Sequence, residues 1–238
     1  MFKNLNVKHS LKISVVTLFP QMFQGPFDHS IVKLAKENGK VEINLVDLRD
    51  FGIGKHKTVD DTPYGGGIGM VLRVDVVKKA IDSVRTNSKH EKVILMSARG
   101  KPFVQQTAND YSKLDSLIII CGHYEGIDER IHDYIDEEVS VGDFVTTGGE
   151  IPAMAITDAV TRLIPGVLKE GATDNESFSL RDNENTLLEY PHYTRPPEFE
   201  GKSVPEILTS GNHKEIEKWR MQEAKKVTKL RRKDLLKK

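Results

Sequence analysis

The stretch SLIIICGHYEGIDERI, residues 116–131, indicates the fold class. Its first half is an unbroken apolar run of strand length, which is typical of a strand that is buried on both faces of a sheet. A glycine follows, and charged residues then begin a segment with helical spacing. We therefore expect an interior strand of a parallel α/β sheet, with polar side chains at its carboxyl end, where such sheets bind ligands.

The flanking sequence repeats this alternation of apolar runs and helical spacing. We expect further strands at residues 13–19, 41–48, 92–97 and 139–145, and helices at residues 27–37, 75–85, 103–111, 127–135 and 151–163. Asp75 is the expected N-cap of its helix, because a short acidic side chain accepts hydrogen bonds from the first N–H groups. Strands and helices in this order predict a mostly parallel sheet that is covered on both faces.

A change in composition divides the chain after Pro165. Residues 1–165 carry the α/β pattern, whereas residues 166–195 are rich in Gly, Asp, Asn, Glu and Ser and have little periodic apolar content. That composition is typical of a flexible linker between domains. Residues 196–238 carry helical patterns, so we expect a small all-α C-terminal domain there.

Charge is balanced overall but not along the chain. The sequence has 35 Lys and Arg against 35 Asp and Glu, yet 12 Lys and Arg stand against 5 Asp and Glu from Lys202 to the C-terminus. A basic C-terminal region of this kind indicates either a polyanionic partner such as nucleic acid or a solvated helical tail.

The cysteine content and the length of the apolar runs indicate the cellular compartment of the protein. Cys121 is the only cysteine, so no intrachain disulfide is possible, which suits a reducing compartment. No apolar run approaches the roughly 18 residues that a membrane span needs, and the N-terminus lacks the apolar core of a signal peptide. We expect a cytoplasmic protein with no membrane partner.

Three glycine-containing segments concentrate the possible chemistry. PYGGGIGM, residues 63–70, lacks the lysine of a phosphate-binding P-loop and the spacing of a dinucleotide fingerprint, so it is either a structural turn or another kind of ligand loop. In CGHYEGIDERI, residues 121–131, Cys121 and His123 could be a nucleophile and base or metal ligands. Because no second Cys or His stands at ligand spacing, we expect Cys121 to pack in the core and no metal to bind.

The third segment is SVGDFVTTGGEIPAM, residues 140–154, in which a Gly-Gly turn joins a strand to a helix. Bare glycine backbone at such a junction either receives an adenine or a ribose or forms a tight corner. Glu150 and Pro152 suit the first turn of the helix that follows.

These segments resemble, in order and spacing, those of the bacterial tRNA (guanine-N1)-methyltransferase family, TrmD. The resemblance extends over nearly the whole chain, through ISVVTLFPQMF at residues 13–23, RLIPGVL at 162–168, YPHYTRP at 190–196 and SGNHKEIEKWR at 210–220, besides the three glycine segments. Any one motif can arise by chance, whereas seven in the right order identify the family.

The resemblance implies a SPOUT fold, an α/β domain that contains a deep trefoil knot, which is a rare exception to the absence of knots in proteins. It implies S-adenosylmethionine as cofactor and a homodimer in which the linker and helical domain of one chain cover the cofactor of the other. By motif matching, the cofactor loops are residues 95–99, 122–126 and 141–152. The expected cofactor-binding residues are Leu95, Met96, Ser97, Ala98, Gly122, Tyr124, Glu125, Gly126, Val141, Gly142, Phe144, Thr146, Gly148, Gly149 and Pro152.

The resemblance also implies the reaction, methylation of N1 of guanine 37, next to the anticodon of tRNA. N1 carries a proton that a base must remove, and negative charge then develops on O6, where a cation stabilises it. The family places an aspartate base in a D-S-F sequence of the linker, but this chain has Glu176-Ser177-Phe178, so Glu176 is the expected base and Asp174 the alternative. Arg162 is the expected cation.

We expect the RNA to contact residues from the glycine-rich loop to the C-terminal domain. The expected substrate-binding residues are Gly66, Gly67, Asp128, Ser177, His192, Arg195, Asn212 and Arg220. Lysines and arginines at 225–238 would contact phosphates, while Trp219 is expected in the core rather than as a stacking platform. A SPOUT enzyme that modifies another base or a ribose, and an RNA-binding module without activity, are the alternatives.

Overall fold

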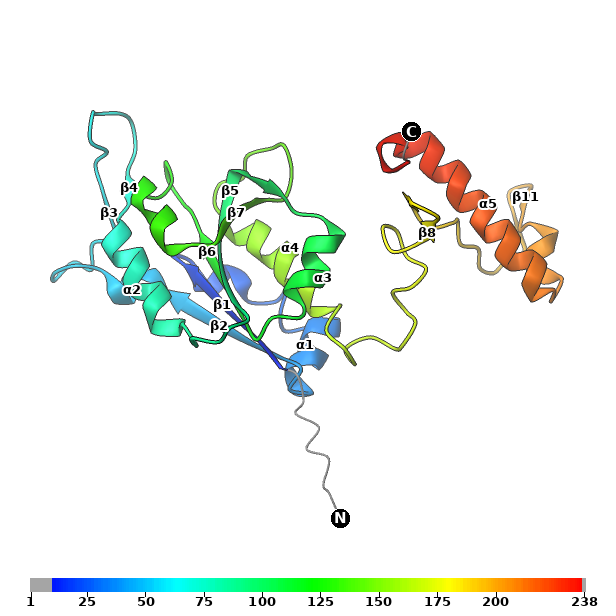
Figure 1. The fold of residues 1–238 in the computed structure, drawn as a ribbon, viewed down its shortest axis with the longest axis horizontal. Helices are drawn as coiled ribbons and strands as arrows, with labels where there is room; N and C mark the ends of the chain where they lie inside the picture. The colour runs from blue at the N-terminus through cyan, green and yellow to red at the C-terminus, as the bar shows by residue number, and fades with distance from the viewer. Residues whose placement is uncertain (1–9, 237–238) are drawn as a thin grey trace, which may run out of the picture. The chain divides into compact units, whose positions relative to one another are not determined.

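A computed structural model describes residues 10–236, which form two compact units (Figure 1). Within the described residues, the boundary between the two units lies between Leu168 and Lys169. Predictions for the N-terminal nine residues and for Lys237 and Lys238 fall outside the described residues. Within residues 10–236, no helix is both long enough and apolar enough to cross a membrane.

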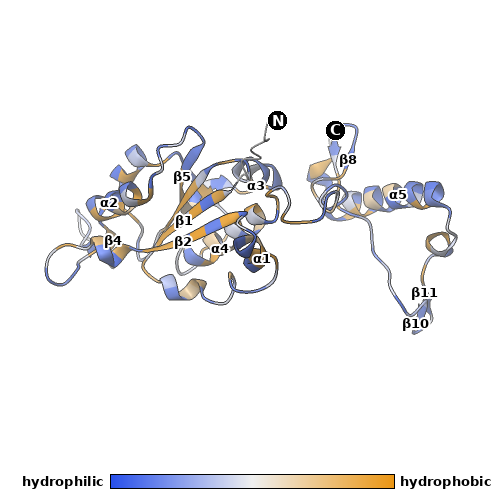
Figure 2. Ribbon diagram, turned by 90° about the horizontal axis from the view of Figure 1, so that it is seen from below, coloured by the Kyte–Doolittle hydropathy of each residue, from blue (hydrophilic) through white to orange (hydrophobic). Residues whose placement is uncertain are grey.

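The first unit is built on a five-stranded sheet in which every neighbouring pair is parallel. The strand order is β2-β1-β6-β5-β7. Their bounds are β1 Leu11–Thr17, β2 Val41–Asp47, β5 Glu91–Pro102, β6 Ser116–Cys121 and β7 Glu137–Ser140. All six residues of β6 are buried, and Figure 2 shows how apolar the neighbouring β1 and β2 are. The prediction of a parallel α/β sheet with residues 116–121 in its interior is confirmed.

Helices cover both faces of this sheet. The bounds are α1 Ser30–Glu37, α2 Val74–Val84, α3 Gln105–Tyr111 and α4 Glu150–Thr161. Side chains alternate along each strand, so Ile119 of β6 joins the core cluster of α1, α3 and α4, while Ile118 and Ile120 join that of α2. The two clusters hold the layers together through burial of apolar surface.

Some local predictions are wrong. Helix α2 begins at Val74 with Arg73 as its N-cap, and Asp75 lies in the first turn, where its carboxylate pairs with the Arg73 guanidinium at 3.1 Å. Residues expected as a helix at 127–135 contain only the 3-10 helix η3, Glu129–Tyr134. The strand expected at 139–145 ends at Ser140, because the chain turns at Gly142, where any Cβ would lie 2.5 Å from the Phe144 ring.

Short elements complete the first unit. Strands β3, Asp60–Asp61, and β4, Val71–Leu72, form an antiparallel pair, and the glycine-rich loop between them projects from the body of the unit (Figure 1). The 3-10 helices η1, Pro20–Phe23, and η2, Leu48–Phe51, follow β1 and β2.

The second unit is not purely helical. Its main element is α5, His213–Arg231, accompanied by η4, Glu206–Thr209, and η5, Lys233–Leu235. Two antiparallel pairs of very short strands precede them, β8 Arg181–Asp182 with β9 Asn185–Thr186, and β10 Glu198–Phe199 with β11 Lys202–Ser203.

Part of the segment expected as a linker belongs to the core of this second unit. Leu180 and Leu187 are buried with Ala224 of α5. The backbone N–H of Leu188 donates a hydrogen bond to Oγ1 of the buried Thr228, at 2.9 Å. This stretch therefore has defined packing of its own rather than the solvated character that its composition indicates.

Candidate active site

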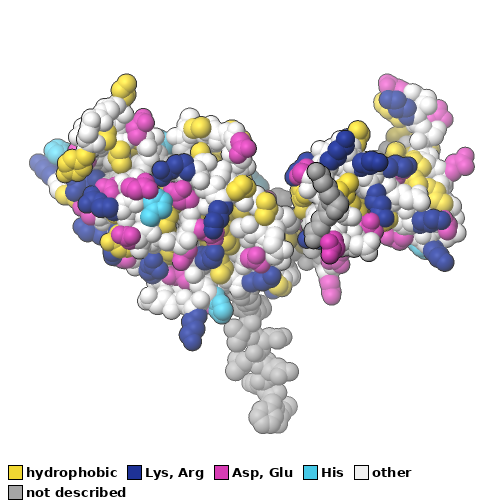
Figure 3. Space-filling view, turned by 45° about the horizontal axis from the view of Figure 1, so that its top comes forward, with side chains coloured by type: hydrophobic (Ala, Val, Ile, Leu, Met, Phe, Trp, Pro, Cys, Tyr) yellow, Lys and Arg dark blue, Asp and Glu magenta, His cyan; other side chains and the backbone are white. Residues whose placement is uncertain are grey.

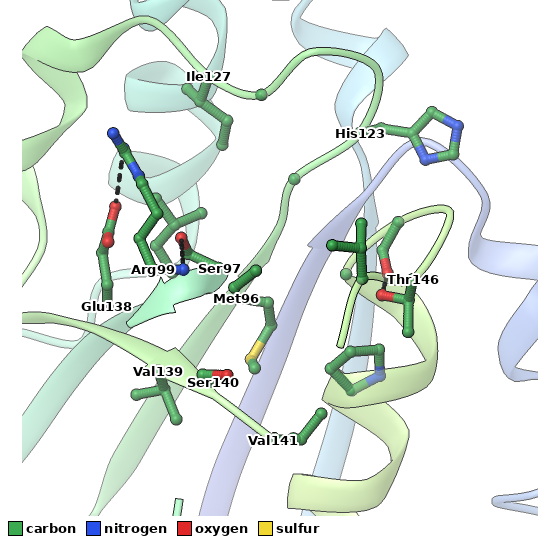
Figure 4. Close-up of a pocket in the computed structure, with 18 of the residues that line it drawn as sticks. Met96, Ser97, Arg99, His123, Ile127, Glu138, Val139, Ser140, Val141 and Thr146 are labelled. Atoms are coloured by element: carbon green, nitrogen blue, oxygen red, sulfur yellow. Dashed lines mark hydrogen bonds and ion pairs between the residues drawn. The ribbon is translucent and has the colours of Figure 1, made fainter. Parts of the chain in front are cut away.

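A cavity of about 450 Å³ lies at the carboxyl ends of β5, β6 and β7. Residues 95–99 within β5 line it together with the loops that follow β6 and β7, and Figure 4 shows side chains of these segments around it. All fifteen residues expected to bind the cofactor lie in its wall. The position is the one at which open parallel sheets receive ligands.

Close backbone contact joins two of these loops. The N–H of Gly149 donates a hydrogen bond to the carbonyl of Gly122, at 2.8 Å. A Cβ on Gly149 would lie 2.7 Å from Cα of Cys121, and one on Gly148 would lie 2.3 Å from Oε2 of Glu150. A methyl group on Gly149 would meet backbone atoms of Cys121 and push the two loops apart, whereas one on Gly148 would displace the Glu150 carboxylate and the His123 ring.

The glycine-rich loop PYGGGIGM is attached to the cavity only at its end. The N–H of Glu125 donates to the carbonyl of Met70 at 3.1 Å, and the N–H of Leu72 donates to the carbonyl of Gly126 at 2.9 Å. Gly66 and Gly67, both expected to bind substrate, are exposed and do not line the cavity. Asp128, also in that expected set, caps η3 by accepting the N–H of Arg130.

A buried polar group lies directly behind the cavity. Glu150, only 1% exposed, accepts a hydrogen bond from Oγ1 of Thr17 at 2.8 Å. Its other oxygen is 3.8 Å from Nδ1 of His123, a buried ring nitrogen with no hydrogen-bond partner among the described residues. The sequence analysis placed Glu150 only in the first turn of its helix, and no sequence signal distinguished it from Asp158 of the same helix.

A charged network that the sequence did not reveal forms part of the cavity wall. Nη2 of Arg99 lies 3.3 Å from carboxylate oxygens of both Glu129 and Glu138; Figure 4 shows the contact with Glu138. His132 completes the network, with Nε2 at 2.9 Å from Glu138 and Nδ1 at 2.8 Å from the carbonyl of Glu129. Because both ring nitrogens face acceptors, the protonated ring is favoured, and the pKa of His132 is raised, chiefly by the Glu129 carbonyl.

Cys121 is unsuited to nucleophilic chemistry. Its side chain is buried at the end of β6, and burial raises the pKa of the thiol well above its usual range, with a smaller contribution from Glu150. The thiolate is the reactive form of cysteine, so this thiol is inert. Among residues 10–236, no group of three His, Cys, Asp or Glu side chains could hold a metal ion.

The two expected catalytic residues belong to different units. Arg162 is the C-cap of α4 in the first unit. Glu176 lies in the second unit, where its carbonyl accepts the N–H groups of Ser179 and Leu180. Asp174, the alternative base, lies two residues earlier in the same unit, where its N–H donates to the carbonyl of Gly171 at 3.3 Å.

The remaining expected substrate residues also lie in the second unit. Ser177 accepts the N–H of Glu189 through Oγ, and His192 pairs with the Glu189 carboxylate at 3.1 Å. Asn212 caps α5, while Arg195 is exposed. The guanidinium of Arg220 pairs with Glu217 at 2.6 Å and also lies 5.0 Å from the centroid of the Tyr190 ring.

Comparison with known proteins agrees with this architecture. Residues 11–238 match the family described as tRNA (Guanine-1)-methyltransferase TrmD. A tRNA (guanine-N(1)-)-methyltransferase of Desulforudis audaxviator is 52% identical over 94% of this chain and 89% of the relative. Proteins of the same name from Dictyoglomus turgidum and Lactobacillus helveticus are each 52% identical, over 96% and 95% of this chain and 91% of each relative. The chain therefore belongs to the tRNA (guanine-1)-methyltransferase TrmD family.

Proposed function

We propose that this protein transfers a methyl group from S-adenosylmethionine to N1 of guanine 37 in tRNA. The observation that carries the proposal is the cavity at the carboxyl ends of β5, β6 and β7, built by glycine segments in a chain of the TrmD family. Its volume falls in the range of roughly 300–1,000 Å³ that is usual for small-molecule and cofactor sites.

The wall of the cavity suits S-adenosylmethionine. Gly148 and Gly149 line the cavity without side chains, and their neighbours pack so closely that a Cβ on either would clash with protein atoms. Apolar side chains, among them Leu95, Phe144 and Pro152, line the cavity together with the acidic residues Glu125, Glu129 and Glu138. When bound, the cofactor supplies an electrophilic methyl group on a positively charged sulfur, and acidic residues stabilise such a cation.

The protein's own residues would then handle the proton of guanine N1. We assign Glu176 as the base that accepts it, with Asp174 as the alternative, and Arg162 as the cation that stabilises the charge developing on O6. Residue types support these roles, because a carboxylate is a competent base at neutral pH and an arginine remains charged. The assignments rest on the family resemblance.

Finer features follow from the same resemblance and remain proposals. They are a SPOUT fold with a deep trefoil knot in the loops after β5, β6 and β7, a homodimer, and a cytoplasmic location. We also propose that residues 1–165 bind the cofactor, that residues 166–195 supply the catalytic acid and that residues 196–238 bind tRNA. Part of the 166–195 segment nevertheless packs in the core of the second unit.

Methyl transfer to defined RNA tests the proposal. Purified protein is incubated with labelled S-adenosylmethionine and unmodified tRNA transcripts that either contain guanine 37 or have adenine there. Label should enter only the first transcript and appear as N1-methylguanine after nuclease digestion. Equal labelling of both transcripts, or label on another base or on a ribose, would show that a different RNA site is modified.

A pair of isosteric variants decides the base. Glu176→Gln should abolish methylation while leaving the affinity for S-adenosylmethionine unchanged, and Asp174→Asn should retain activity. If Asp174→Asn is the inactive variant, the base is Asp174. Calorimetric binding of S-adenosylmethionine to the wild type separates both outcomes from a purely RNA-binding protein, which would not bind the cofactor.

A further inference from the structure

A second concave surface lies entirely within the second unit. It is an open groove of about 830 Å³. Tyr193 and Arg195 lie on one segment of its wall with Pro196 and Pro197, and Val204 and Leu208 lie on another. None of the eight described residues in the wall is acidic, so Arg195 gives the groove a positive charge.

Aromatic and cationic side chains alternate beside this groove. The Tyr193 ring packs 6.3 Å from the ring of Trp219 on α5, yet 49% of Tyr193 remains exposed. The neighbouring Arg220 stacks on Tyr190 at 5.0 Å, and the ring of His192 lies 5.0 Å from the same tyrosine. Trp219 thus serves to hold Tyr193 in place, while Tyr193 offers its own surface to the groove.

We propose that this groove binds one unstacked nucleotide of the tRNA, distinct from the guanine that is methylated. The base stacks on Tyr193, and Arg195 contacts an adjacent phosphate. The inference rests on the proposed function, since it names a further part of the same RNA substrate.

Three properties favour a nucleotide over an apolar ligand. A half-exposed aromatic ring beside an arginine is the arrangement with which proteins hold unpaired bases. The groove wall lacks acidic residues, and Val204, Leu208 and Thr209 of the wall lie in the segment from residue 202 onward, which has 12 Lys and Arg against 5 Asp and Glu. On the second unit, Figure 3 shows Lys and Arg side chains gathered on the face in view, interspersed with a few acidic ones, which suits a polyanion.

Substitutions in the full-length protein separate stacking from charge. Tyr193→Leu keeps apolar packing on Trp219 but removes the flat ring, so it should weaken tRNA binding by about five- to hundredfold. Tyr193→Trp should bind within about threefold of the wild type, because indole also stacks. Neither variant should alter the affinity for S-adenosylmethionine or the thermal midpoint. Phe199→Ala is the matched control, since Phe199 is an aromatic residue 64% exposed outside the groove.

Salt dependence distinguishes the two roles. Arg195→Gln should reduce the slope of log affinity against log salt by about one, because one phosphate contact is lost, whereas Tyr193→Leu should leave that slope unchanged. Transcripts with single 5-iodouridine substitutions at unpaired positions would then locate the contact, since light should crosslink one of them to Tyr193.

The outcomes for this groove and for the proposed function are distinguishable. If tRNA is methylated normally but Tyr193→Leu binds tRNA like the wild type, the groove is not a nucleotide site. A crosslink from the groove to position 37 itself would also overturn the inference. If no tRNA is methylated while Tyr193 still determines tRNA affinity, the proposed function fails and the nucleotide site stands.

Discussion

The cavity of the first unit depends on two positions that have no side chain, Gly148 and Gly149. Neither needs glycine for an unusual backbone angle; Gly149 has φ −78° and is the N-cap of α4. What each needs is space, because Cα of Cys121 and the carboxylate of Glu150 occupy the volume that a Cβ would take. The resulting contact between loops creates one continuous wall from segments that lie far apart in the sequence.

Gly149→Ala should therefore destabilise the first unit. Backbone atoms of Cys121 and Gly122 cannot move away as a flexible side chain would, so overpacking should cost about 1–3 kcal/mol of unfolding free energy. Cofactor affinity should fall by more than about tenfold as the two loops separate. Chemical denaturation and calorimetry measure the two effects.

Gly122→Ala is the matched control for this substitution. The added Cβ would lie 3.6 Å from the carbonyl oxygen of Met96, which is its nearest atom outside the adjacent residues and an ordinary contact. The stability of this variant should stay within about 0.5 kcal/mol of the wild type, while cofactor affinity alone changes because the new methyl group projects from the cavity wall. Equal stability of both variants would contradict the packing argument.

At the residue scale, sequence reasoning predicted the loops better than the charged groups around them. Glycine segments and family resemblance sufficed to name fifteen residues that the structure places in one wall. The pairing of Arg99 with Glu129 and Glu138 was not predicted, because it depends on β5, η3 and β7 meeting in space. Charged residues on their own are usually solvated, so no local pattern distinguished these from others on the surface.

At the scale of secondary-structure elements, η3 and β7 are connected by a contact that includes a titratable histidine. His132 of η3 holds the Glu138 carboxylate of β7 at 2.9 Å, and its pKa is raised, chiefly by the hydrogen bond to the Glu129 carbonyl. A group whose pKa is raised in the folded state stabilises the protein fully below its unfolded pKa, here about 6.5, and loses that contribution as the pH rises through the folded value.

His132→Gln should therefore cost more stability at pH 6 than at pH 8.5. The comparison requires the unfolding free energy of wild type and variant at both pH values. His56→Gln is the control, because this exposed histidine forms no ion pair among the described residues and should show the same difference at both pH values. A cost for His132→Gln that grows with pH would reverse the assigned direction.

Helix α4 is tied to β1 by the buried Glu150. Its carboxylate accepts from Thr17 Oγ1, which in turn accepts the N–H of Phe19 at 3.0 Å. Glu150→Ala leaves a buried hydroxyl without its acceptor and a small void, so we expect a loss of about 2–4 kcal/mol of unfolding free energy. Glu150→Gln keeps an acceptor oxygen and should cost about 1 kcal/mol or less.

A double-mutant cycle checks that Thr17 is the partner responsible. Thr17→Val and Glu150→Ala, measured singly and together by denaturation, should show a coupling energy of about 1 kcal/mol or more. Additive effects would mean that Glu150 is held by contacts other than this hydrogen bond.

Secondary-structure elements were predictable where both of their faces are buried, and less so where a local turn determines the type of element. Strand β6 is buried on both faces, which leaves a continuous apolar run that only a strand of that length explains. Ile127, Ile131 and Ile135 have the spacing of a helix face, but only Ile131 is fully buried. The Asp128 side chain accepts the N–H of Arg130 and begins a tighter 3-10 turn, a local hydrogen bond that competes with the regular helix.

At the scale of the whole molecule, the residues expected to bind the cofactor and the residue expected to act as base lie in different units. All fifteen expected cofactor residues belong to the first, whereas Glu176 and the cations of α5 belong to the second. Composition could not reveal that Leu180 and Leu187 pack in a core, because they lie in a stretch rich in polar residues. Their burial depends on α5, which follows more than twenty residues later in the chain.

A fragment that ends at Leu168 should therefore bind the cofactor without methylating tRNA. It retains both apolar clusters that pack against the sheet, so it should unfold in a single cooperative transition. It lacks the proposed base and the basic region, so methyl transfer should fall below detection while calorimetry still registers S-adenosylmethionine. Full-length Glu176→Gln is the control that lacks only the base and should bind tRNA normally. Methylation by the fragment at the wild-type rate would place the base in the first unit and would refute the assignment of both Glu176 and Asp174.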